Sequence, residues 1–131
     1  MASIHKELLL DARPDDVWSA VRDFGAPHEK LVPGVLVDSR PEPGARVVTF
    51  ANGLVVRELL VELNDDSRRL CWTARGGRAT HHNASMQVIA DGSRTRLVWI
   101  TDVLPDEIAP AISALVEAGA AAIARKFERS R

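Results

Sequence analysis

The sequence predicts an α+β fold in which an antiparallel sheet of about seven strands wraps around a long C-terminal helix, with two short helices after the first strand. A helical pattern runs over residues 106–127, and segments with a period of two fill residues 35–104. Short turns join these segments, which favours antiparallel pairing. A helix with one apolar stripe must be covered, so we expect the sheet to cover it.

The C-terminal segment 106–127 is long enough to cross the domain, since its residues at about 1.5 Å each give roughly 33 Å. Its large apolar residues mostly recur three or four apart: Ile108, Ile112, Leu115, Val116, Ile123 and Phe127. Residues with almost no side-chain volume lie between them: Ala118, Gly119, Ala120, Ala121, Ala122 and Ala124. We expect this narrow middle to leave an internal pocket beneath the sheet.

The N-terminal part predicts a strand over residues 3–11 and a helix that begins at Pro14 and ends before Gly25. A second helix is predicted over residues 27–31. Six further strands are then predicted, over residues 35–40, 46–51, 54–63, 68–74, 81–90 and 95–103.

The dipeptide Asn52-Gly53 predicts a two-residue type I′ hairpin, which would pair Ala51 with Leu54. Cross-strand partners share a face. The face with smaller residues and a single charge is predicted to point toward the helix: Val47, Thr49, Ala51, Leu54, Val56, Glu58 and Leu60.

The same alternation predicts further inward-facing residues on the later strands: Leu70, Trp72, Ala74, His82, Ala84, Met86, Val88, Leu97, Trp99 and Thr101. The candidate ligand-binding residues are taken from these strands and the helix: Glu58, Thr49, Val56, Trp72, His82, Ala84, Met86, Trp99, Leu115 and Gly119.

Composition limits the classes of protein. The 131 residues suit one domain, residues 1–131, and the net charge of −1 without a basic run argues against a nucleic-acid partner. A single cysteine, Cys71, excludes an internal disulfide. We expect no signal peptide and no membrane-spanning segment, and therefore a cytoplasmic protein. His81 and His82 point to opposite faces and cannot chelate one ion, so we expect no metal site and no cofactor.

The predicted order of elements is that of the helix-grip arrangement, and the sequence resembles the START-like (SRPBCC) superfamily. This superfamily includes the birch-pollen-allergen fold, the polyketide cyclase/dehydrase-like family and, more distantly, the plant abscisic-acid receptors. The matching pieces are Val17 to Phe24 through Pro27, Arg57 to Leu60 through Asp65-Asp66, Gly76-Gly77 with His82 to Ser85, and Thr95 to Trp99.

The resemblance implies a cavity between the sheet and the last helix that binds an apolar small molecule. Glu58 matches the receptor glutamate that faces the cavity. Other receptor features are missing: a tight turn replaces the gate loop, Arg78-Ala79-Thr80 replaces the latch, Ala84 replaces the ligand tyrosine, and only Lys30 approximates the ligand lysine. Hormone binding and a phosphatase partner are therefore not carried over.

Glu58 is the main candidate, because a carboxylate on an apolar face must be paired or hydrated. It could anchor a ligand or transfer a proton, or it could simply pair with a nearby arginine. On the first view, Glu58→Gln would weaken binding and leave the melting temperature nearly unchanged.

The leading hypothesis is a protein that binds an apolar or amphipathic small molecule: a lipid, a polyketide or an aromatic metabolite. The alternative is a cyclase/dehydratase-like enzyme in which Glu58 moves a proton. A third hypothesis is a filled pocket, with the protein acting through its sheet edge or as a homodimer.

Overall fold

The computed structural model describes residues 2–128. In chain order the elements are β1 (Ala2–Leu10), α1 (Pro14–Arg22), α2 (Pro27–Lys30), β2 (Leu36–Glu42), β3 (Ala45–Phe50), β4 (Val55–Asn64), β5 (Arg69–Arg75), β6 (His81–Asp91), β7 (Arg94–Leu104), the short 3₁₀ helix η1 (Asp106–Ile108) and α3 (Ala109–Lys126). The predicted order of elements is confirmed.

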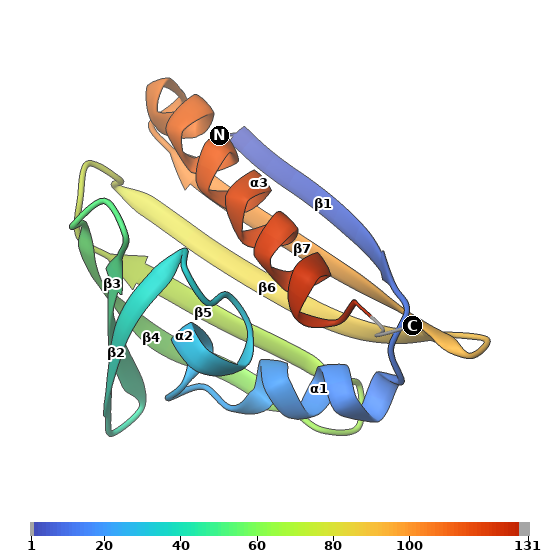
Figure 1. Ribbon diagram of the computed structural model, residues 1–131. Helices are drawn as coiled ribbons and strands as arrows, with labels where there is room; N and C mark the ends of the chain where they lie inside the picture. Colours follow the sequence, from blue (N-terminus) through green and yellow to red (C-terminus); the bar gives the residue numbers. More distant parts are fainter. Residues whose placement is uncertain (1, 129–131) are drawn as a thin grey trace.

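The strands form one antiparallel sheet in the order β1-β7-β6-β5-β4-β3-β2. Figure 1 shows α3 lying along the inner face of the curved sheet, while α1 and α2 lie at its lower end in this view. This is the predicted helix-grip fold.

The inner face of β5, β6 and β7 has the predicted alternation. Burial recurs at every second residue along each of these strands. The apolar residues that this alternation places in the core are Leu70, Trp72, Ala74, Ala84, Met86, Val88 and Leu97. The period of two therefore identified the core-facing side correctly where the strands are long and regular.

The predicted register of the β3–β4 hairpin is wrong by one residue. Thr49 pairs with Val55 and Arg46 pairs with Glu58. The amide of Phe50 donates to the Leu54 carbonyl oxygen at 2.8 Å, so three residues, 51–53, connect the strands where two were predicted. At the end of this connection, the amide of Leu54 donates to Asn52 Oδ1 at 3.0 Å. A shift of one residue turns every side chain of one strand to the other face.

The shift exchanges the two faces of β3 and leaves those of β4 as predicted. Arg46 and Val48 are buried on the inner side, and Thr49 lies on the outer side beside the exposed Val55. Val56 and Glu58 face inward as expected. Thr49 is thus removed from the cavity wall, and Arg46 takes a place on the inner face.

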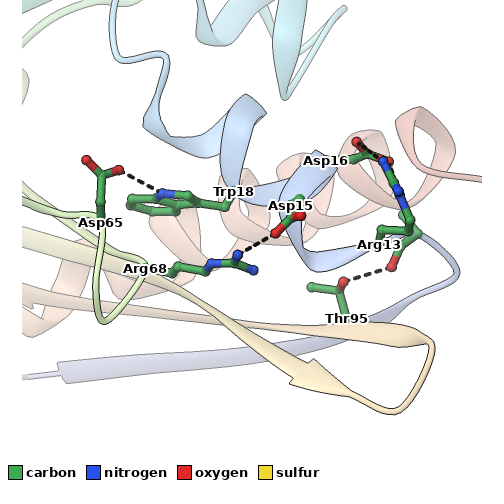
Figure 2. Close-up of polar contacts among 8 residues, drawn as sticks. Arg13, Asp15, Asp16, Trp18, Asp65, Arg68 and Thr95 are labelled. Atoms are coloured by element: carbon green, nitrogen blue, oxygen red, sulfur yellow. Dashed lines mark hydrogen bonds and ion pairs between the residues drawn. The ribbon is translucent and has the colours of Figure 1, made fainter.

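Polar contacts hold α1 against the turn between β4 and β5 (Figure 2). Asp65 Oδ1 accepts hydrogen bonds from Trp18 Nε1 at 2.9 Å and from Arg22 Nε at 2.8 Å. Arg68 forms an ion pair with Asp15 in the first turn of α1. These contacts fix the helix whose inner residues, Val17 among them, enter the core.

Asp65 is expected to make stability depend on pH. The hydrogen bond from Arg22, followed by that from Trp18, lowers the pKa of Asp65 below its ordinary value. Its contribution is therefore present above the unfolded-state pKa of about 3.9 and is lost as the pH falls through the lower folded-state pKa. Asp65→Asn keeps an acceptor for Trp18 but should lower the urea midpoint at neutral pH. The difference in urea midpoint between Asp65→Asn and wild type should shrink at about pH 2. An equal difference at both pH values would show that the charge of Asp65 is not the cause.

The helical segment Asp106–Lys126 is long and apolar enough to meet the length and hydropathy criteria for a membrane span. The core helix of a soluble protein meets the same criteria. In this fold its residues Val116, Ala120 and Ile123 are buried.

Candidate functional site

A pocket of about 500 Å³ lies between the first half of α3, the strands β3, β4 and β6, and the loops at residues 51–54 and 76–80. Its deeper wall is mainly apolar and includes Phe50, Val56 and Ile112. Its rim consists of exposed residues, among them Asn52 and Arg78. We call this space the outer pocket.

A smaller space of about 80 Å³ continues inward from the outer pocket, and we call it the inner chamber. The two spaces share five lining residues: Phe50, Glu58, His82, Ile112 and Leu115. The inner chamber extends toward β5, β6 and β7, with Trp72, Ala84, Trp99 and Thr101 on its walls. Glu58 and His82 therefore lie where the two spaces meet.

Glu58 is paired with Arg46 across the β3–β4 register. Arg46 Nε donates to Glu58 Oε1 at 2.7 Å, and the two side chains are only 6% and 10% exposed. The Arg46 guanidinium also donates to the Phe24 carbonyl oxygen at 3.0 Å. Its Cζ lies 4.0 Å from the centre of the Phe24 ring and 5.2 Å from that of Trp72. The arginine is thus held in place by charge, hydrogen bonding and ring contacts.

His82 faces the same junction from β6. Burial lowers the pKa of His82, and the opposing influence of the Glu58 carboxylate is smaller. The imidazole is therefore neutral at neutral pH. It can donate or accept a hydrogen bond without bringing a charge into the cavity.

The middle of α3 is packed more closely than the sequence suggested. A Cβ atom at Gly119 would lie 2.8 Å from Trp99 Cη2 and 3.0 Å from Cζ3, so the glycine makes room for the indole ring. Ala122 is 1% exposed and belongs to the core. The expectation that these residues hold an open space is wrong for Ala122, and Gly119 borders only the inner chamber.

The structure brings most of the predicted site residues together. Val56, Glu58, His82 and Leu115 line the outer pocket, and the inner chamber is lined by Glu58, Trp72, His82, Ala84, Trp99, Leu115 and Gly119. Two predicted residues lie elsewhere. Thr49 is on the outer face of the sheet, and Met86 is buried in the core without lining either space.

Several lining residues were not predicted. Phe50 was assigned to the outer face by the wrong hairpin register. Ile112 lies three residues before Leu115 on the same helix face, so helical periodicity could have identified it. Arg78 and the two glycines before it lie in a loop at the rim, where no local pattern indicates which way the chain turns.

The outer face of the sheet carries a shallow polar depression that includes Cys71, Asn83 and Asp102. Burial raises the pKa of the Cys71 thiol, which keeps it protonated and unreactive at neutral pH. Within residues 2–128, no group of three His, Cys, Asp or Glu side chains is arranged to hold a metal ion.

The long helix gripped by an antiparallel sheet, with a cavity between them, is the architecture of the START-like superfamily. The sequence matches the family described as polyketide cyclase / dehydrase and lipid transport over residues 1–129, and the chain belongs to this family. A search of curated protein sequences finds no match.

Solved structures show the same fold at low sequence identity. The protein XoxI from Bacillus cereus is 20% identical with a TM-score of 0.84, over 97% of this chain and 96% of that one. A START superfamily protein from Mycobacterium smegmatis is 15% identical with a TM-score of 0.74, over 95% and 96%. Norcoclaurine synthase from Thalictrum flavum, in complex with dopamine and hydroxybenzaldehyde, is 21% identical with a TM-score of 0.70, over 99% and 89%.

Proposed function

We propose that the protein binds a small apolar or amphipathic molecule, such as a lipid, a polyketide or an aromatic metabolite, between the sheet and α3. The observation that carries this proposal is the mainly apolar outer pocket of about 500 Å³ that continues into the inner chamber. Small-molecule sites are typically cavities of about 300–1,000 Å³ with apolar walls and a few polar groups. Removal of the ligand's apolar surface from water would supply most of the binding energy.

Glu58 and His82 are the polar groups that would orient the ligand, since both line the outer pocket and the inner chamber. Binding without chemistry is the preferred proposal. The Glu58 carboxylate is already held by Arg46, and few other polar groups converge on the space.

The alternative is a cyclase/dehydratase-like enzyme in which Glu58 transfers a proton on an activated carbonyl compound. One observation favours it: a carboxylate and a neutral imidazole line the same junction, which supplies a second polar group for acid–base chemistry. The similarity to norcoclaurine synthase supports the fold and adds nothing to this point.

Native mass spectrometry of freshly purified protein tests the proposal. We expect an adduct whose released molecule is mainly apolar, and we expect Ala111→Leu, which narrows the outer pocket, to reduce the adduct. A binding protein should return the molecule with its mass and structure unchanged after prolonged incubation. Conversion of the molecule by wild type but not by Glu58→Gln would support the enzyme instead. Protein that carries no adduct and binds none of a panel of apolar compounds would contradict both.

A further inference from the structure

The inner chamber carries polar groups of its own on β7. Trp99 and Thr101 are two residues apart on this strand, and both line the chamber. Trp99 Nε1 is buried and has no hydrogen-bond partner within residues 2–128. Thr101 is 1% exposed.

An unpaired buried donor is uncommon, because leaving it without a partner costs about 1–3 kcal/mol. The Trp99 ring has little freedom to avoid this cost by turning. Its Cη2 and Cζ3 atoms lie where a side chain at residue 119 would begin, so the ring fills the notch that Gly119 provides. The fold thus holds an indole N–H at the wall of a small space and leaves it unused by the protein.

The formal charges around the chamber are balanced. Glu58 is neutralised by Arg46 at 2.7 Å, and burial keeps His82 uncharged at neutral pH. A charged group that entered the chamber would therefore lack a counterion and would lose its hydration. Arg78, the other charged residue around these spaces, is exposed at the rim of the outer pocket.

We propose that the inner chamber is a subsite for the hydroxyl group of a neutral ligand, whose oxygen accepts a hydrogen bond from Trp99 Nε1 and whose proton is donated to Glu58. The ligand's apolar body then occupies the outer pocket. The chamber's volume of about 80 Å³ suits a group the size of a few water molecules, not a ring. This inference rests on the proposed function and specifies its ligand class as alcohols or phenols.

The test compares naphthalene, 2-naphthol and 2-naphthoate, which share one apolar body, by calorimetric titration at neutral pH. Wild type is expected to bind 2-naphthol at least about tenfold more tightly than naphthalene, because its hydroxyl makes one neutral hydrogen bond and one to a carboxylate. The anionic 2-naphthoate should bind most weakly. Trp99→Phe keeps an aromatic ring in the notch but lacks the N–H, so the preference for 2-naphthol should fall about threefold to tenfold while naphthalene binding stays within about twofold.

Thr101→Val is the nearly isosteric control at the same wall, and it should keep the preference for 2-naphthol because neither proposed hydrogen bond involves its hydroxyl; melting temperatures establish that the variants are folded. If Trp99→Phe does not fold, the double variant Arg46→Met with Glu58→Leu, which lacks the carboxylate acceptor, carries the test by its reduced preference for 2-naphthol. Binding of naphthalene and 2-naphthol with equal affinity to wild type would overturn the subsite and leave the proposed function standing. Tightest binding of 2-naphthoate would overturn it equally, and failure of all three compounds to bind would overturn both.

Discussion

Replacing Arg46 by alanine is expected to lower the free energy of unfolding by about 3 kcal/mol, at the lower end of the range for breaking a buried ion pair. The variant leaves Glu58 with its side chain only 10% exposed and without its counterion. It also removes the guanidinium that lies over the Phe24 ring and donates to the Phe24 carbonyl oxygen. Urea unfolding followed by circular dichroism measures the change.

The double variant Arg46→Met with Glu58→Leu is the matched control. Replacing both partners by apolar groups removes the unpaired charge, so much of the lost stability should return. Arg46→Lys keeps the charge but not the planar guanidinium, and we expect an intermediate loss. A double variant that is no more stable than Arg46→Ala would show that the unpaired carboxylate is not the source of the loss.

The ion pair also changes what Glu58→Gln should do. On the view that Glu58 anchors a ligand, the sequence predicts that this variant leaves the melting temperature nearly unchanged. The structure gives Glu58 a buried partner, and Glu58→Gln would leave Arg46 without its counterion. A lower melting temperature is therefore expected together with any loss of binding, so binding must be compared at a temperature where both proteins are folded.

The sequence predicted the fold well because its signals are local and repeated. The alternation along residues 69–75, 81–91 and 94–104 settles which side of each long strand is buried. The hairpin at Asn52-Gly53 shows the limit of such signals. Whether two or three residues connect the strands depends on tertiary contacts, here the burial of Arg46 against Phe24 and Glu58, and no local pattern contains that information.

The candidate site was predicted in part for the same reason. Glu58, His82 and Trp99 could be placed by alternation from regular strands, and they line the cavity. The location of the larger space could not be predicted. It depends on which small residues of α3 are covered by side chains from the sheet and which are left uncovered. Trp99 fills the notch at Gly119, and the open space lies nearer the start of the helix, at Ala111 and Ala114.

Two alanine-to-leucine variants on α3 should therefore behave in opposite ways. Ala122 is 1% exposed in the core, so Ala122→Leu must force extra volume into packed side chains and should cost about 1–3 kcal/mol of stability. Ala111 is exposed and lines the outer pocket, so Ala111→Leu should leave stability within about 0.5 kcal/mol. Urea unfolding of the two variants against wild type measures this contrast.

The two variants should differ in ligand affinity in the opposite sense, with the larger loss of affinity in Ala111→Leu. Ala111→Leu places a larger apolar side chain at the wall of the outer pocket and should weaken binding of 2-naphthol by more than about threefold, because it takes up part of the space beside the ligand. Ala122→Leu, measured where it is folded, should retain affinity within about threefold, since Ala122 lines neither space. Gly119→Leu should resemble Ala122→Leu in stability, because its Cβ would lie 2.8 Å from Trp99 Cη2. Ala122→Leu with unchanged stability and lost binding would instead place the ligand beneath the middle of α3, and the outer pocket would then not be the site.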